Sequence, residues 1–177
     1  LPPRLYSVAN SPKVTPDRVD FVVETLRYDR CGRPCEGVAG VWLADRVGVD
    51  GLVPLYLAPN DQFRLPADDV DIIMVGPGTG IAPFRAFLQE REATGASGRS
   101  WLFFGHQHEA TDFLYGDELR AWQNSGRLTR ADYAWSRDQD EKVYVQHRML
   151  ARGADVWAWL QGGAHVFVCG DAIGMAP

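Results

Sequence analysis

The stretch 75–91, VGPGTGIAPFRAFLQER, contains three glycines: Gly76, Gly78 and Gly80. They follow an apolar, strand-like run and precede an amphipathic, helix-like run. Glycine lets the backbone approach a pyrophosphate closely, and a helix N-terminus offers free N–H groups with a partial positive charge. Thr79 adds a hydroxyl that suits a phosphate or a ribose. The spacing departs from G-x-G-x-x-G, because Ile81 stands at the third glycine position. A nucleotide site is therefore predicted, with a purely structural turn as the alternative.

A second group of polar residues lies in the stretch 135–146, WSRDQDEKVYVQ. Ser136, Arg137 and Lys142 combine a hydroxyl with two cations, and Arg137 suits bidentate phosphate contacts. Tyr144 offers a ring on which adenine can stack. The preceding strand-like run ends in Gly105 and a histidine, without the acid that usually holds the ribose of NAD. The group indicates a 2′-phosphate site, although the interleaved acids also allow a solvated charged loop.

The cysteines and histidines do not form a metal-binding pattern. Cys31, Cys35 and Cys169 are interpreted as free thiols in a reducing compartment, with a Cys31–Cys35 disulfide as the alternative. His106 and His108 lack a third ligand nearby in the sequence, so no metal site is expected.

The elements that position these residues change character near residue 67. Before it, the residue patterns predict strands over 18–28 and 52–59, a helix over 37–47 and a linker over 64–69. After it, strands are predicted over 70–76, 100–105, 128–136 and 164–170. Helices are predicted after residue 81, over 112–126, and over 143–163 in two pieces divided near Gly153. Apolar strands that alternate with helices predict a parallel sheet covered on both faces.

Composition excludes several classes of protein. The chain has 177 residues, 46% hydrophobic and 23% charged, as in globular proteins. A formal net charge of −5 gives no overall attraction to nucleic acid or to an anionic membrane. No apolar run reaches the roughly 18 residues that span a bilayer. We expect a cytoplasmic protein.

Taken together, the motifs resemble the ferredoxin–NADP⁺ reductase-like module of diflavin reductases. The matching pieces are RLYS (4–7), GPGTGIAPFRAFLQER (76–91), FFG (103–105), DFLY (112–115), SRDQ (136–139), EKVYVQ (141–146) and VCGDA (168–172). The resemblance is strongest to the flavoproteins of NADPH-dependent sulfite reductase, with cytochrome P450 reductases more distant. It implies an α/β fold in which a partial antiparallel FAD-binding β-barrel precedes a Rossmann-like NADP-binding domain.

The resemblance also implies roles for individual residues. Arg4, Tyr6 and Ser7 match a flavin motif, in which the arginine meets the FAD pyrophosphate, the tyrosine packs on the flavin ring and the serine lies near flavin N5. Gly76, Gly78, Thr79 and Gly80 match the NADPH pyrophosphate loop. The residues that match the 2′-phosphate and adenine site are Ser136, Arg137, Lys142, Tyr144 and Gln146. Ser7, Cys169 and Asp171 are the implied catalytic residues beside the nicotinamide and the flavin.

One motif departs from the family pattern. The family places G-x-x-S or G-x-x-T at the helix that holds the FAD pyrophosphate, whereas this chain has Gly37-Val38-Ala39-Gly40. The missing hydroxyl predicts weaker FAD binding by about one hydrogen bond, roughly 0.5–1.5 kcal/mol. Gly40→Ser is then expected to tighten FAD.

The resemblance divides the chain at residue 67. Residues 1–67 would be the C-terminal part of an FAD-binding domain, and residues 68–177 an NADP-binding domain without its C-terminal end. We expect a chain truncated at both ends, with an FMN domain upstream. The implied activity is hydride transfer from NADPH to FAD and onward electron transfer to an FMN domain or a siroheme sulfite reductase subunit. The alternatives are a cytochrome P450 reductase-type electron donor and a nucleotide-binding fragment without redox activity.

Overall fold

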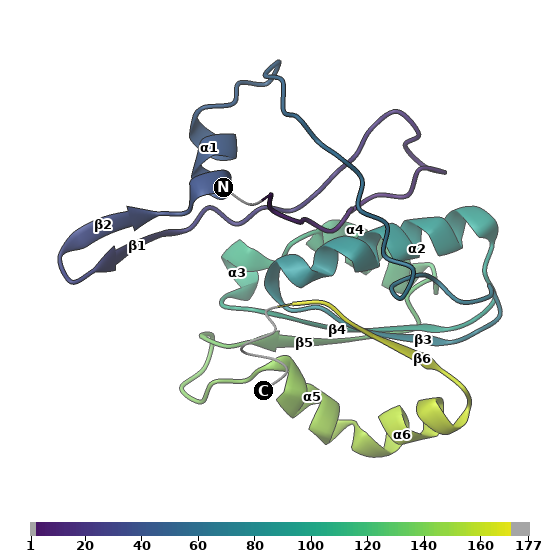
Figure 1. Ribbon diagram of the computed structural model, residues 1–177. Coiled ribbons are helices and arrows are strands. Elements are labelled where there is room, and N and C mark those ends of the chain that lie inside the picture. The colour runs from purple at the N-terminus through teal and green to yellow at the C-terminus, as the bar shows by residue number, and fades with distance from the viewer. Residues whose placement is uncertain (1–2, 171–177) are drawn as a thin grey trace.

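A parallel sheet between two layers of helices forms the centre of the molecule (Figure 1). The computed structural model describes residues 3–170. The helices α2 (Ala82–Thr94), α3 (Glu109–Asp112) and α4 (Gly116–Asn124) lie on one side of the sheet. The helices α5 (Val145–Ala151) and α6 (Gly153–Gln161) lie on the other. The α/β class predicted from the sequence is confirmed.

The four strands of this sheet run in the order β5-β4-β3-β6. They are β3 (Ile72–Val75), β4 (Ser100–His106), β5 (Arg130–Trp135) and β6 (His165–Val168). Ile72 of β3 pairs in parallel with Ser100 of β4 on one side and with His165 of β6 on the other. The strand order therefore reverses between β3 and β6. In open parallel sheets, ligands bind beyond the carboxyl ends of the strands at such a switch point.

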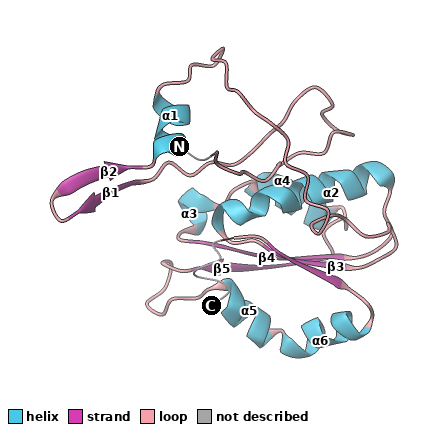
Figure 2. Cartoon of the chain, viewed as in Figure 1, coloured by secondary structure: helices cyan, strands magenta, loops and turns pink. Residues whose placement is uncertain are grey.

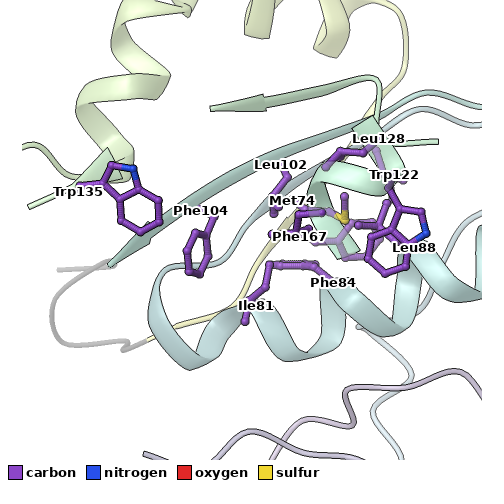
Figure 3. Packing of buried hydrophobic residues seen from close by; sticks show 12 residues of the cluster. Met74, Ile81, Phe84, Leu88, Leu102, Phe104, Trp122, Leu128, Trp135 and Phe167 are labelled. Carbon is purple, nitrogen blue, oxygen red and sulfur yellow. The ribbon is translucent and has the colours of Figure 1, made fainter. Parts of the chain in front are cut away.

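The central strand β3 and most of β4 are apolar and buried because both faces of the sheet are covered there. Ile72, Met74, Leu102, Phe104 and Phe167 pack in a cluster with Phe84 and Leu88 of α2 (Figure 3). Ile73, Val75, Trp101 and Phe103 pack on the opposite face with Val145 of α5 and Trp159 of α6. Alternate residues of one strand thus enter different clusters, as the pleat of a strand requires.

Most elements predicted after residue 67 are confirmed. The four predicted strands correspond to β3–β6, and the two-piece helix divides at Arg152, beside the predicted Gly153. The helix predicted over 112–126 begins only at Gly116. Tyr115 causes this difference, because its φ of 57° interrupts the helical backbone before that residue.

The segment before residue 67 contains less regular structure than predicted (Figure 2). The helix α1 (Val38–Asp45) agrees with the predicted 37–47. The strands predicted over 18–28 and 52–59 are mostly wrong: the first range holds a Val8–Phe21 bridge and the start of β1, and the second holds no strand. β-branched residues favour strands only where a neighbouring strand can pair, and Leu52 and Leu57 remain exposed here.

A two-stranded hairpin was not predicted. β1 (Arg27–Arg30) and β2 (Arg33–Glu36) pair antiparallel around Cys31 and Gly32. Both turn residues have positive φ, 55° and 75°, the backbone of a tight two-residue hairpin turn. Cys31, Cys35 and Cys169 are free thiols, as interpreted from the sequence. The small antiparallel sheet followed by the parallel sheet agrees with part of a flavin-binding barrel before a Rossmann-like domain.

Candidate functional site

The glycine loop connects β3 to α2 at the switch point of the sheet. The Gly76 N–H donates to the Phe103 carbonyl at 3.0 Å, and a 3-10 turn over Gly78–Ile81 leads directly into α2. Gly78 has a φ of +57°, a conformation that side chains disfavour. A Cβ on Gly80 would overlap the Cys169 carbonyl oxygen and lie 2.8 Å from its carbon. Two of the glycines are therefore required by the backbone itself.

The same loop offers groups that could bind a phosphate. Thr79 is exposed, and its hydroxyl makes no hydrogen bond within residues 3–170. No side chain caps the start of the 3-10 turn or of α2, so no side chain competes for their first N–H groups. Backbone without side chains, a free hydroxyl and a helix N-terminus together fit a pyrophosphate.

Cys169 and Ser7 meet at the end of β6. The Cys169 N–H donates to the Val75 carbonyl at 2.9 Å, which holds the thiol beside the end of β3. The Ser7 Oγ lies 3.8 Å from the Cys169 Sγ, although 162 residues separate them in the chain. Burial raises the pKa of the Cys169 thiol, and the Ser7 hydroxyl partly opposes this effect. The thiol is therefore neutral at ordinary pH. Asp171, the third expected catalytic residue, lies outside the described residues.

The other residues of the expected flavin motif lie next to Ser7. Tyr6 is 39% exposed and stacks on Phe21, with ring centroids 5.7 Å apart. Phe21 also forms an isolated β-bridge with Val8, so the aromatic pair adds to the contact between Phe21 and the segment that carries the flavin motif. Arg4 is exposed and forms no ion pair within the part of the chain that the structure describes. The motif thus presents an aromatic ring, a hydroxyl and a guanidinium to solvent.

The helix α1 begins at the expected second flavin motif. Gly37 precedes the helix, and no side chain caps its N-terminus. Gly40 is buried against the neighbouring backbone, where a Cβ would lie 2.5 Å from the Glu24 carbonyl oxygen. The serine that the family has at this position would collide with that carbonyl. The structure therefore argues against the expectation that Gly40→Ser improves FAD binding.

The expected 2′-phosphate residues occupy one continuous segment, from the end of β5 to the first turn of α5. Backbone bonds from Ser136 to the His106 carbonyl and from Arg137 to the Gln107 carbonyl, both 2.9 Å, extend the pairing of β5 with β4. Arg137 and Lys142 are exposed and form no ion pair within residues 3–170. Gln146 is exposed on α5. Tyr144 is 42% exposed, with its ring beside His147.

Sequence reasoning missed contacts that engage Asp138, one of the acids interleaved with these cations. Asp138 accepts the Glu109 N–H at 2.9 Å and contacts the His108 Nδ1 at 2.8 Å. The Glu109 amide, and then the His108 ring, hold the pKa of Asp138 below its usual range. Asp138 is thus directed toward α3 instead of toward Arg137. His108 was a signal for this contact that we interpreted, together with His106, only in terms of metals.

Neither of two surface hollows includes the glycine loop or Cys169. A hollow of about 340 Å³ borders Gly95 and Gly126, and one of about 750 Å³ borders Phe113 and Arg120. The candidate site therefore rests on topology and residue chemistry, not on an enclosed cavity. Within residues 3–170, no three His, Cys, Asp or Glu side chains are grouped as metal ligands. No helix of that region is long and apolar enough to cross a membrane.

Comparisons with known proteins show the family to which the chain belongs. Residues 74–177 match the family described as the oxidoreductase NAD-binding domain. The chain is 53% identical over 177 residues to the sulfite reductase [NADPH] flavoprotein alpha-component of Yersinia enterocolitica, covering 99% of this chain and 30% of the relative.

The corresponding proteins of Yersinia pestis and Serratia proteamaculans are also 53% identical, with 99% of this chain covered. The chain spans 29% of the former and 30% of the latter, so it corresponds to less than a third of these relatives. The resemblance to a ferredoxin–NADP⁺ reductase-like module is confirmed.

Proposed function

The chain belongs to the oxidoreductase NAD-binding domain family, and from this we propose that it is part of an NADPH-dependent flavoprotein reductase. One observation carries the proposal. Ser7 and Cys169 come from opposite ends of the chain and meet with 3.8 Å between Oγ and Sγ, at the switch point of the parallel sheet. The N-terminal segment thus brings a flavin-type motif to the place where a parallel sheet binds its nucleotide.

For NADPH, we assign the pyrophosphate to the loop Gly76–Gly80. Thr79 would add its hydroxyl to the backbone N–H groups at the start of α2. Arg137 and Lys142 would bind the 2′-phosphate together with the Ser136 hydroxyl. Tyr144 and Gln146 would contact the adenosine. Two observations support this assignment. Arg137 and Lys142 are exposed, and the neighbouring Asp138 is engaged by His108 and Glu109.

For FAD, we assign Arg4 and the α1 N-terminus after Gly37 to the pyrophosphate, and Tyr6 to the flavin ring. When bound, the nicotinamide supplies a hydride, and the flavin accepts it and releases single electrons. Ser7 and Cys169 would line the path between the two rings and exclude water from it. A neutral thiol suits this role, because it neither attacks nor repels the hydride. Asp171 follows two residues after Cys169 and is proposed to act beside it.

For the whole protein, we propose hydride transfer from NADPH to FAD and electron transfer onward in sulfite reductase. The proposal follows from the similarity to the sulfite reductase [NADPH] flavoprotein alpha-components. Residues 1–67 would belong to the FAD-binding domain and residues 68–177 to the NADP-binding domain. The partners would be an FMN domain and a siroheme subunit, in the reducing cytoplasm that free thiols favour.

Two other functions are kept as alternatives. A cytochrome P450 reductase-type donor would use the same site and a different electron acceptor. A nucleotide-binding fragment without redox activity is favoured by one observation, namely that Gly40 lacks the family hydroxyl and has no room for it. This alternative predicts NADPH binding without FAD.

The test is calorimetric titration of the purified chain with 2′,5′-ADP and with 5′-AMP, followed by a visible spectrum after addition of FAD. Two charge-assisted contacts to the 2′-phosphate predict about 10- to 100-fold tighter binding of 2′,5′-ADP. Equal affinities would overturn the NADPH assignment. A 2′,5′-ADP preference without a bound-flavin spectrum would select the redox-inactive alternative.

A further inference from the structure

The outer face of α2 holds the segment that follows Ser7. Ile81, Phe84 and Leu88 turn toward the sheet and fill the core (Figure 3). Arg85 and Gln89, one turn apart on the same helix, contact the N-terminal segment instead. The helix thus has two functions in packing, an apolar face for the sheet and a polar face for residues 9–20.

Arg85 makes the central contacts of this polar face. It is only 9% exposed, and its guanidinium donates to the Ala9 carbonyl at 2.8 Å and to Asp20 at 3.2 Å. The same guanidinium binds both carboxylate oxygens of Glu118 on α4, at 2.9 and 3.0 Å, and lies 4.6 Å from the Tyr115 ring centroid. Burial alone would lower the pKa of Arg85, but Glu118 and the other partners outweigh it and raise the pKa. Arg85 is therefore charged and held in one geometry.

Two further residues of α2 extend the contact. Gln89 accepts the Ser11 N–H at 2.9 Å, and Glu90 pairs with Lys13 at 2.7 Å and also contacts the Ser11 hydroxyl. The segment is closed on itself by Asn10, which is 3% exposed and accepts the Asp20 N–H at 2.6 Å. Ala9, Asn10 and Ser11 are all buried. The segment is thus a defined loop fixed to α2.

We infer that Arg85 is a positioning residue that sets Ser7 against Cys169. Ser7 precedes the anchored Ala9 by two residues, so the chain allows it to lie at most about 7 Å from that anchor. α2 begins directly after the glycine loop, and its first turns carry Arg85. One rigid helix therefore fixes both the proposed nucleotide loop and the proposed flavin segment. The role of Arg85 in the reaction rests on the proposed function, whereas its control of the Ser7–Cys169 approach does not.

The experiment measures that approach without any cofactor. In the full chain with Cys31→Ser and Cys35→Ser, the substitution Ser7→Cys places two thiols where the hydroxyl and thiol now meet. Copper-phenanthroline then oxidises the pair to a disulfide, and the rate follows from the loss of free thiol. Arg85→Ala should slow this rate at least about tenfold, because a mobile segment holds the two thiols in contact for a smaller fraction of the time. Arg85→Lys should give an intermediate rate, because lysine keeps the positive charge but cannot donate the two parallel N–H bonds of a guanidinium.

A control separates this effect from the general loss of an arginine that binds a carboxylate and covers an aromatic ring. Arg99 also binds a carboxylate twice, through Asp71, and covers an aromatic ring, that of Trp159. It does not touch residues 9–20, so Arg99→Ala should leave the disulfide rate within about twofold. If Arg85→Ala does not fold by circular dichroism, Arg85→Lys and Gln89→Ala carry the same test.

The outcomes distinguish this inference from the proposed function. Disulfide rates unchanged in the folded Arg85 and Gln89 variants would overturn the inference. Slowed rates with 2′,5′-ADP affinity retained would support it, because the nucleotide loop is intact in these variants. Slowed rates in a chain that shows no preference for 2′,5′-ADP would support the positioning by Arg85 and refute the NADPH assignment.

Discussion

Replacing Gly80 by alanine should separate the glycine loop from the end of β6. The added Cβ would lie 2.8 Å from the carbonyl carbon of Cys169, whereas carbon atoms pack at about 3.5–4.0 Å. The two backbones must therefore move apart by about 1 Å. This strains the bond of 2.9 Å between the Cys169 N–H and the Val75 carbonyl. Overpacking of this kind costs about 1–3 kcal/mol, and in a chain of this size each kcal/mol lowers Tm by about 2–4 °C.

The assay is thermal unfolding of Gly80→Ala, followed by near-ultraviolet circular dichroism, with calorimetric titration of 2′,5′-ADP. We expect a Tm lower by about 2–12 °C and weaker nucleotide binding. Gly153→Ala is the matched control, because nothing lies within 4 Å of its Cβ and α6 begins at this residue. It should leave Tm unchanged or raise it, since alanine favours a helix over glycine. A Tm of Gly80→Ala within about 1 °C of the parent would refute the close approach of the loop to β6.

Three further predictions concern other contacts. Arg137→Ala with Lys142→Ala should weaken 2′,5′-ADP about 10- to 100-fold and 5′-AMP less than about twofold in calorimetry; equal losses would contradict the 2′-phosphate assignment. Cys169 should react with iodoacetamide at pH 8 about tenfold more slowly than the exposed Cys31, because burial raises the pKa of the Cys169 thiol; equal labelling in peptide mass spectra would contradict this. Asp71→Asn should lower the free energy of unfolding at pH 7 by about 1 kcal/mol, a value reduced for solvent screening. Burial alone would raise the pKa of Asp71, but the hydrogen bonds and the charge of Arg99 outweigh burial and lower the pKa. The contribution of Asp71 to stability is therefore present above its unfolded-state pKa and is lost as pH falls through its folded-state pKa. If urea unfolding gave the same difference in free energy between the parent and Asp71→Asn at pH 7 and at pH 2, this prediction would be contradicted.

The strands and helices after residue 67 were predictable because each carries its own pattern. The run Ile72–Val75 is apolar at every position, as a short strand covered on both faces requires. The strand predicted over 52–59 failed for the opposite reason. Leu55 and Leu57 have the composition of a strand, but pairing depends on a neighbour that the local sequence does not specify.

The candidate site also contains residues that the sequence predicted and contacts that it did not. The glycine loop and the segment from Ser136 to Gln146 were found because their residues are close together in the sequence. The engagement of Asp138 by His108 was not found, because it joins the ends of two different strands. Gly40 shows the converse error: the motif suggested that a serine would fit, and only the position of the Glu24 carbonyl showed that it would not.

The sequence alone determined the class of the fold, the alternating elements and the residue types suited to a phosphate. These follow from local periodicity and from the chemistry of neighbouring side chains. The tertiary structure decided which distant groups meet. The order β5-β4-β3-β6 brings Cys169 beside the glycine loop, and the polar face of α2 holds the segment that carries Ser7. Such contacts join residues far apart in the chain, and their positions are set by packing in three dimensions, which no local pattern of residues encodes.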